Sequence, residues 1–210
     1  MSPAVLVFTK APQAGVSKTR LIPALGADKA AAAQEMLALR TLGMTAELGV
    51  TEAEYQVSLW GAVAHPALDL WANRFGLPLR WQAAGDLGEK MLHGLASALA
   101  DGADQAVLIG TDCPVMTAEY IRQAHMALRS SDLVLGPAED GGYVLIGCKQ
   151  VDAKLFTNIA WGSDKVLAQT LEQAEQMKLS VTLLETLWDV DRPEDWARFQ
   201  GLPSGSGGTD

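Results

Sequence analysis

Short apolar, strand-like segments alternate with segments of helical periodicity through most of the 210-residue chain. In the first two thirds we expect five strands and four intervening helices. The expected strands are 5–8, 55–60, 79–82, 105–109 and 133–135, and the expected helices are 28–48, 66–75, 87–100 and 118–128. This alternation is typical of an α/β sheet whose parallel strands are joined by right-handed helical crossovers.

The rhythm changes after residue 135. A strand at 143–148 follows the previous one through an Asp-Gly-Gly turn, which predicts an antiparallel hairpin within a mostly parallel sheet. A helix at 163–177, a strand at 181–185 and a helix at 193–199 complete the pattern. We expect residues 1–200 to form a single α/β domain and the Gly/Ser-rich residues 201–210 to form a flexible tail.

Composition excludes several classes of protein. The formal charge of -9 argues against nucleic acid as the main partner, because phosphate backbones bind broadly basic surfaces. The two cysteines provide no disulfide framework, and no Cys/His cluster has the spacing of zinc ligands. Neither a secretory signal nor an apolar run of about 18 residues is present, so we expect a cytoplasmic protein without membrane contact.

A basic loop follows the first expected strand. Residues 10–20 carry Lys10, Lys18 and Arg20 together with Pro12 and Gly15. Free backbone N–H groups and cationic side chains in such a loop make a phosphate receptor, and we expect Lys18 and Arg20 to bind phosphates without supporting the fold. The alternative is an exposed loop with solubilising charges. A true P-loop is disfavoured, because proline and serine replace its two glycines.

Acidic residues follow three of the later strands. Asp112 lies just beyond the carboxyl end of the strand at 105–109, where ligands bind in open α/β sheets. Asp140 lies in the turn before residue 143, and Asp189 and Asp191 follow the last strand. Carboxylate oxygens suit Mg²⁺ or Mn²⁺, so the loops predict a metal site beside the phosphate site. The alternatives are a helix cap for Asp112, a plain hairpin turn at Asp140 and an N-cap for Asp191.

Five motifs occur in an order that resembles a known group of proteins. They are Phe8–Leu21, Gly85–Met91, Gly110–Pro114, Gly136–Tyr143 and Asp189–Asp195. The chain resembles a family of small bacterial glycosyltransferases in the nucleotide-diphospho-sugar transferase superfamily over residues 4–199. More distantly, it is similar to the phospholactate guanylyltransferase and molybdenum-cofactor nucleotidyltransferase families.

The resemblance implies a GT-A-type, Rossmann-like α/β/α sandwich with a mostly parallel sheet of about seven strands. It also implies that Lys18, Arg20 and Asp112 are catalytic, that Asp112 binds the metal, and that Asp191 or alternatively Asp189 is the second ligand. The nucleotide-binding residues would be Lys10, Pro12, Gly15, Lys18, Arg20, Gly85, Asp86, Glu89, Lys90 and Thr111. The acceptor-binding residues would be Asp140, Gly141, Gly142 and Trp161.

The predicted function is therefore a metal-dependent transferase with a nucleoside triphosphate or nucleotide sugar as donor and a small-molecule acceptor. The characterised nucleotidyltransferases open with Leu-Ala-Ala-Gly-x-Gly-x-Arg-Met, whereas this chain has Thr-Lys-Ala-Pro-Gln-Ala-Gly at 9–15. Glycosyl and nucleotidyl transfer both stay open, as does a homodimer. The alternative is a nucleotide-binding regulatory or scaffold domain without turnover.

Other reactive or aromatic residues are expected to be structural. The three histidines are scattered, and Cys113 has no neighbouring base, so it is interpreted as a small buried hydrophobic residue. Core packing is expected for Trp60, Trp71 and Trp81.

Overall fold

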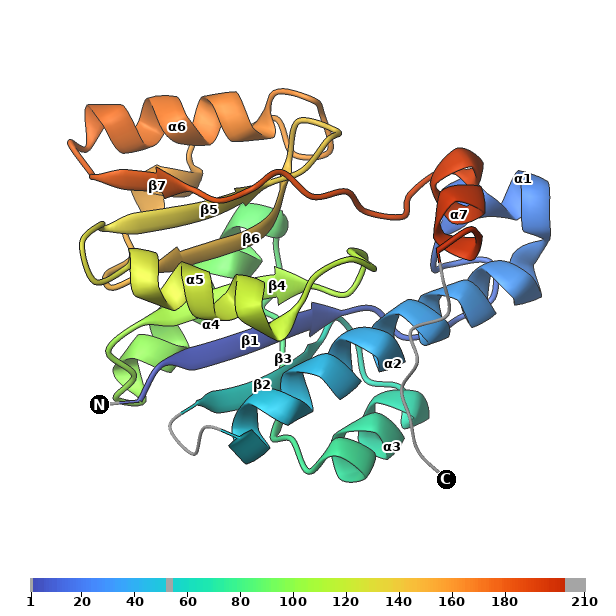
Figure 1. Cartoon of the computed structure of the whole chain (residues 1–210). Coiled ribbons are helices and arrows are strands. Elements are labelled where there is room, and N and C mark those ends of the chain that lie inside the picture. Colours follow the sequence, from blue (N-terminus) through green and yellow to red (C-terminus); the bar gives the residue numbers. More distant parts are fainter. Residues whose placement is uncertain (1, 52–54, 203–210) are drawn as a thin grey trace.

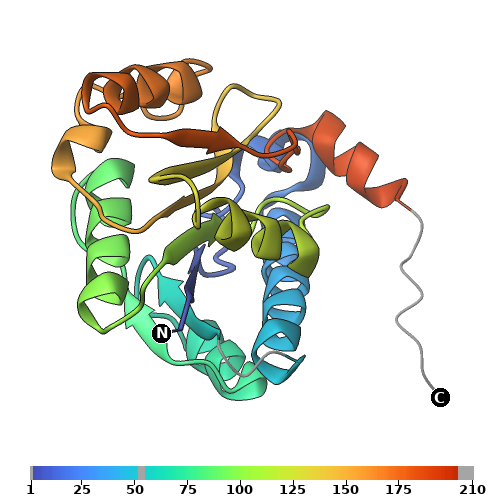
Figure 2. The same cartoon turned by 60° about the vertical axis from the view of Figure 1, so that its left-hand side comes forward.

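The computed structural model describes residues 2–51 and 55–202, which form a seven-stranded sheet between two layers of helices (Figures 1 and 2). The strand order is β3-β2-β1-β4-β6-β5-β7. Strand β6 pairs antiparallel with both β4 and β5, and the other strand pairs are parallel. The strands are β1 (Ala4–Thr9), β2 (Gln56–Gly61), β3 (Leu79–Trp81), β4 (Ala106–Gly110), β5 (Leu133–Pro137), β6 (Tyr143–Cys148) and β7 (Val181–Leu183). The predicted mixed α/β sheet is confirmed.

Alternating side chains of the central strands supply two apolar cores. On β1, Val5 and Val7 face one core, whereas Leu6 and Phe8 face the other, as the two-residue period of a strand requires. Helices α2 (Ala27–Thr51), α3 (Pro66–Phe75) and α5 (Ala118–Ala127) cover the first face. Helices α4 (Leu87–Ala100) and α6 (Val166–Gln176) cover the second. Within the described residues, no helix combines the length and apolar character that crossing a bilayer requires.

The sequence did not predict three short helices, which are η1 (Thr19–Leu21), α1 (Ile22–Leu25) and η2 (Ala153–Phe156).

A third apolar cluster brings η1, α1 and the start of α2 together with the C-terminal segment. Leu21 packs with Trp188 and Val190, and helix α7 (Pro193–Gln200) contributes Trp196 and Phe199. The basic loop therefore lies beside the C-terminal segment (Figure 1). Leu202 packs on the same cluster, and the rest of the predicted tail, 203–210, lies outside the described residues.

The tryptophans divide between core and surface. Trp60 and Trp71 are buried as predicted. The core prediction for Trp81 is wrong, because this side chain is 44% exposed on β3, the edge strand of the sheet. The alternative role of Asp112 as a helix cap is wrong, because Thr117 is the N-cap of α5 and its hydroxyl accepts a hydrogen bond from the Tyr120 N–H at 3.2 Å.

Candidate active site

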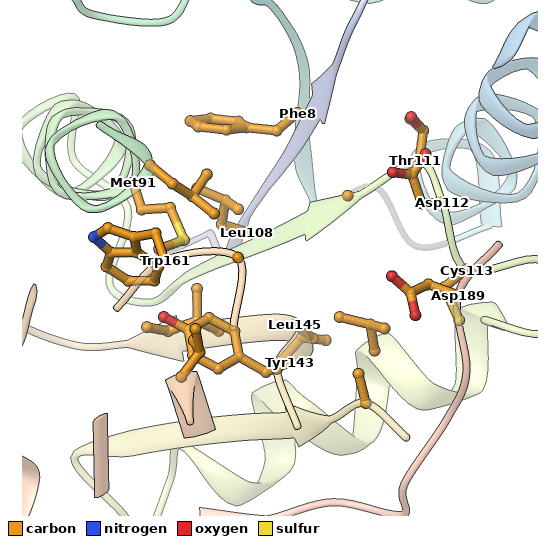
Figure 3. A pocket seen from close by; sticks show the side chains of 18 of the residues that line it. Phe8, Met91, Leu108, Thr111, Asp112, Cys113, Tyr143, Leu145, Trp161 and Asp189 are labelled. Atoms are coloured by element: carbon orange, nitrogen blue, oxygen red, sulfur yellow. The ribbon is translucent and has the colours of Figure 1, made fainter. Parts of the chain in front are cut away.

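A cavity of about 360 Å³ opens at the carboxyl ends of β1 and β4, beside the first residues of β6. Figure 3 shows that it has two chemically different ends. We call one the polar end, formed by Lys10, Thr111, Asp112, Asp140 and Asp189. We call the other the apolar end, formed by Phe8, Met91, Leu108, Tyr143, Leu145 and Trp161. The cavity occupies the edge of the sheet at which open α/β folds bind ligands.

Hydrogen bonds between neighbouring strands build the floor of the polar end. The hydroxyls of Thr9 and Thr111 lie 3.1 Å apart, so the ends of β1 and β4 are tied together. Gln34 of α2 donates its side-chain N–H to the Lys10 carbonyl at 3.2 Å and lies within 3.5 Å of both hydroxyls. Sequence reasoning missed Gln34, because a single glutamine in an alanine-rich helix carries no signal of its own.

The buried Lys18 side chain forms an ion pair with Asp112. Its ammonium lies 2.7 Å from Asp112 Oδ1 and donates a hydrogen bond to the Val190 carbonyl at 2.6 Å. The Lys18 side chain is only 4% exposed, whereas that of Asp112 is 48% exposed. The expectation that Lys18 binds phosphates without supporting the fold did not anticipate this burial, which arises because the loop folds back into the η1 turn and carries the ammonium inward.

Asp189 faces the cavity together with two other carboxylates. Its pKa is raised to about 6, chiefly by burial and then by the negative charges of Asp140 and Asp112, while Lys18 acts in the opposite direction. Three acidic side chains therefore share one electrostatic environment at the polar end. Such mutual repulsion is relieved by a cation.

Asp191 has a different environment from Asp189. Its carboxylate pairs with Arg20 outside the set of residues that line the cavity. The alternative role as N-cap of the last helix is wrong, because Arg192 occupies that position. The Asp195 carboxylate instead accepts hydrogen bonds from the Asp191 and Arg192 N–H groups at 3.1 and 2.7 Å.

The acidic turn between β5 and β6 is held in place from two sides. The Asp140 carboxylate accepts a hydrogen bond from the Gly142 N–H at 2.9 Å, and the Gly141 carbonyl accepts one from the Leu167 N–H at 2.9 Å. Gly141 has φ +88°, and a Cβ there would lie 2.2 Å from the Asp164 carbonyl oxygen. Asp140 is thereby fixed at the cavity, which a plain hairpin turn would not require.

The loop before α4 contributes to the cavity through different residues from those expected. Asp86 and Glu89 form a capping box, in which each carboxylate accepts a hydrogen bond from the other's backbone N–H, at 2.9 and 2.8 Å. Their acceptor groups are thus engaged in starting the helix. Leu87 and Met91 of the same helix line the cavity instead.

The structure divides the predicted site residues into two sets. Those that line the cavity are Lys10, Thr111, Asp112, Asp140, Gly142, Trp161 and Asp189. Those outside its lining are Pro12, Gly15, Lys18, Arg20, Gly85, Asp86, Glu89, Lys90, Gly141 and Asp191. Of the second set, Lys18 still reaches the site, because it bonds to Asp112.

The polar end offers some, but not all, of the ligands that a divalent cation needs. Within residues 2–51 and 55–202, no three acidic, histidine or cysteine side chains come close enough to hold a metal ion by themselves. Asp112 and Asp189 nevertheless offer hard oxygen donors at one cavity. Mg²⁺ commonly takes only one or two protein carboxylates and completes its shell with phosphate oxygens and water. The donor set therefore suits a cation that arrives with a phosphorylated ligand.

The remaining reactive side chains have structural roles. Burial raises the pKa of the Cys113 thiol to about 12, which makes it a poor nucleophile and agrees with its expected packing role. His65 caps α3 by accepting a hydrogen bond from the Ala67 N–H at 3.2 Å. His93 packs edge-on against the Trp60 ring, and His125 is buried.

Comparisons with known proteins identify the family and the fold. The model of a family described as "uncharacterized protein conserved in bacteria (DUF2064)" matches residues 45–163. A candidate nucleotide-diphospho-sugar transferase from Desulfovibrio desulfuricans is 30% identical. The match covers 100% of this chain and 92% of that one, with a TM-score of 0.81. No curated protein matches the chain.

Two more distant structures share the fold. CMP:2-keto-3-deoxy-manno-octonic acid synthetase, in complex with CTP, is 8% identical with a TM-score of 0.57, covering 94% of this chain and 96% of that one. Glucosyl-3-phosphoglycerate synthase from Mycobacterium tuberculosis, in complex with Mn²⁺ and UDP, is 11% identical. Its TM-score is 0.59, with 99% and 83% covered. The chain thus has the nucleotide-diphospho-sugar transferase fold, and it belongs to the DUF2064 family.

Proposed function

We propose that the protein is a divalent-metal-dependent glycosyltransferase that takes a sugar from a nucleoside diphosphate donor and places it on a small-molecule hydroxyl. The observation that carries this proposal is the grouping of Asp112, Asp189 and Asp140 at the polar end, at the strand ends where this fold binds ligands. The similar solved structures support it, since they include a candidate nucleotide-diphospho-sugar transferase and glucosyl-3-phosphoglycerate synthase in complex with Mn²⁺ and UDP.

Asp112 and Asp189 would hold the cation, and Lys10 would contact the donor phosphates. Lys10 is exposed and is the one cationic residue among the described residues that line the cavity. When bound, Mg²⁺ or Mn²⁺ supplies positive charge that stabilises the departing diphosphate. Lys18 keeps the Asp112 carboxylate oriented toward the cavity through its 2.7 Å contact.

In the reaction, the acceptor hydroxyl oxygen forms a bond to the anomeric carbon of the donor sugar. The bond from that carbon to the diphosphate oxygen breaks, and its electron pair leaves with the nucleoside diphosphate. The hydroxyl proton passes to a carboxylate, a role that we assign to Asp140 because Asp112 and Asp189 are committed to the cation. Asp140 lines the cavity on a turn that is fixed to the start of α6.

Charge favours glycosyl over nucleotidyl transfer. A nucleoside triphosphate and a phosphorylated acceptor would bring two highly charged groups to a cavity lined by three carboxylates and Lys10. Lys18 and Arg20 are already paired with Asp112 and Asp191. A nucleotide sugar and an uncharged hydroxyl carry less negative charge into the same space.

Calorimetric titration with nucleoside diphosphates and nucleotide sugars, with and without Mn²⁺, tests the donor site. We expect binding to require Mn²⁺, and Asp112→Asn to weaken it about tenfold or more because a charged ligand is lost. Asp69→Asn, an exposed substitution in the first turn of α3, is the matched control and should change nothing. Equal affinity of Asp112→Asn and the parent would contradict the metal assignment.

Product analysis then tests the reaction class. Release of a nucleoside diphosphate from a nucleotide sugar in the presence of an acceptor supports the proposal. Pyrophosphate release from a triphosphate would replace it with nucleotidyl transfer. Nucleotide binding without any product across the acceptor screen would favour a regulatory or scaffold domain.

A further inference from the structure

Sugars, phosphates and nucleobases are polar, yet the apolar end of the cavity is lined by aliphatic and aromatic side chains. Phe8, Met91 and Leu108 are each less than a tenth exposed although they line the cavity. They come from β1, α4 and β4, and Figure 3 shows them on the side of Tyr143 and Trp161, away from the carboxylates of Asp112 and Asp189. A ligand that fills the cavity must therefore present an apolar surface at this end.

Charge is confined to the opposite end. The charged residues that line the cavity, within the part of the chain that the structure describes, are Lys10, Asp112, Asp140 and Asp189, and all belong to the polar end. A phosphate placed at the apolar end would lose its hydration without gaining a cation, which is strongly unfavourable. This end excludes a phosphorylated group.

A nucleobase fits the apolar end poorly as well. Its ring edge carries several hydrogen-bonding groups, whereas the six residues of the apolar end offer only the Tyr143 hydroxyl and the Trp161 indole N–H. Gln82 and Ser163 also line the cavity, but their side chains already donate hydrogen bonds to backbone carbonyls. The Tyr143 hydroxyl is buried beside the Thr170 side chain of α6, which is itself fully buried, so this hydroxyl is turned toward the helix. The Trp161 indole N–H can pair with one oxygen atom of an otherwise apolar ligand, whereas most of a base edge would stay unpaired.

The Trp161 indole, which lines the cavity, packs against Gly88 of α4 and the Phe156 ring. A Cβ at Gly88 of α4 would lie 2.7 Å from Trp161 Cζ2 and 3.0 Å from Phe156 Cβ, so glycine lets the indole approach the helix closely. The rings of Phe156 and Trp161 are 6.4 Å apart and tilted by 34°. The indole is thus packed against α4. The next two residues, Gly162 and Ser163, also line the cavity.

We propose that the apolar end binds the acceptor, and that the acceptor is an uncharged alcohol or phenol with a flat apolar body and no phosphate of its own. This inference rests on the proposed glycosyl transfer, because it assigns the polar end to the donor. It names the acceptor class that the proposed function leaves open.

A pair of probes that differ only by a phosphate tests the inference. The probes are 2-naphthylmethanol and 2-naphthylmethyl phosphate, and their binding to the full chain is measured by equilibrium dialysis, with and without Mn²⁺ and UDP. We expect the alcohol to bind about tenfold or more tightly than the phosphate, since only the phosphate must be desolvated at an apolar wall.

Three variants locate the bound probe. Trp161→Ala should weaken binding of the alcohol by about 10- to 100-fold, as expected for loss of a large buried apolar contact. Gly88→Ala should weaken it too by pushing the indole away from α4. Both should leave the dissociation constant of Mn²⁺–UDP within about threefold of the parent value. Trp81→Ala, an exposed tryptophan outside the cavity lining, is the matched control and should leave the alcohol bound as in the parent.

Three results would overturn the inference. They are no binding of the alcohol, equal or tighter binding of the phosphate, and equal losses of alcohol and Mn²⁺–UDP binding in Trp161→Ala, which would place the nucleobase at the apolar end. Failure of the proposed function is a separate outcome. It shows as absent or Asp112-independent nucleotide binding, whereas alcohol binding is also measured without nucleotide.

Discussion

Lys18 carries a positive charge into the interior, where its ammonium has two oxygen partners. Asp112 supplies a carboxylate, and Val190 supplies a carbonyl from a position 172 residues away in the chain. Its backbone is left-handed, with φ 50°. A lysine in a polar loop is normally solvated, so local sequence predicted exposure. Asp112, by contrast, could be placed from the sequence, because it lies two residues beyond the end of a strand of known direction.

A matched pair of substitutions separates the buried cation from the surface one. Lys18→Met should lower the free energy of unfolding by about 1–3 kcal/mol, because the Val190 carbonyl loses its charged donor in a buried setting. Arg20→Met removes a half-exposed pair with Asp191 and should cost less than about 1 kcal/mol. Urea denaturation measures both. Equal losses in the two variants would show that Lys18 contributes no more than a surface ion pair.

Elements were predicted more completely than the contacts between them. Within the described residues, the six longer helices could be located from the period of apolar residues, and the seven strands from short apolar runs between turn signals. The turns η1, α1 and η2 span three or four residues and show none. The hairpin of β5 and β6 was predicted, but the position of β6 between β4 and β5 depends on tertiary packing.

Two glycines test how the acidic turn is held. Gly141 and Gly15 both have positive φ, +88° and +79°, but only a Cβ at Gly141 would meet another atom, the Asp164 carbonyl oxygen. Gly15→Ala should therefore cost only the backbone strain, about 1–2 kcal/mol. Gly141→Ala should cost about 1–3 kcal/mol more from overpacking.

Displacement of the turn between β5 and β6 should also affect catalysis at the cavity. Gly141→Ala should reduce turnover in the glycosyl-transfer assay, because Asp140 moves, while Gly15→Ala should preserve it. Chemical denaturation and steady-state kinetics of the two variants check both expectations. A Gly141→Ala variant as stable and active as Gly15→Ala would mean that the turn is not fixed by α6.

At the scale of the whole molecule, a buried histidine lies at the end of the sheet that is opposite the cavity. His125 lies at the end of α5, with its Nδ1 3.1 Å from Gln105 Oε1 and its ring edge-on to Tyr55. Gln105 and Tyr55 directly precede β4 and β2, so this histidine lies at the amino ends of the strands. Its effect on folding can therefore be measured separately from the chemistry of the cavity.

Stability should fall in mild acid because of His125. Burial lowers its pKa from 6.5 to about 4, with a smaller opposing effect of Asp104, so the unfolded chain binds a proton more readily than the folded one. The contribution is fully present above pH 6.5 and is lost as pH falls toward 4, by about 3 kcal/mol in total. Asp189 has the opposite effect, because its pKa is raised to about 6 in the folded protein. Its protonation therefore increases the free energy of unfolding as pH falls from about 6 to 4.

Comparison with His125→Gln isolates the histidine, since Asp189 is common to both proteins. We expect the parent to lose more stability than His125→Gln between pH 7 and pH 5 in urea denaturation. Parallel pH profiles of the two proteins would show that His125 titrates alike in the folded and unfolded chains.

The C-terminal segment has a consequence for how the protein is made. After β7 the chain runs along β5, where the Leu187 N–H bonds to the Pro137 carbonyl, and the Val190 N–H then bonds to the Asp112 carbonyl at 2.8 Å. Asp189 and the carbonyl that accepts from Lys18 therefore leave the ribosome after all seven strands have been synthesised. A growing chain can assemble its sheet and both main cores while the polar end is still unfinished. Under the proposed function, a chain interrupted before Trp188 would lack Asp189 and the Val190 carbonyl and would therefore be unable to bind the metal–nucleotide complex.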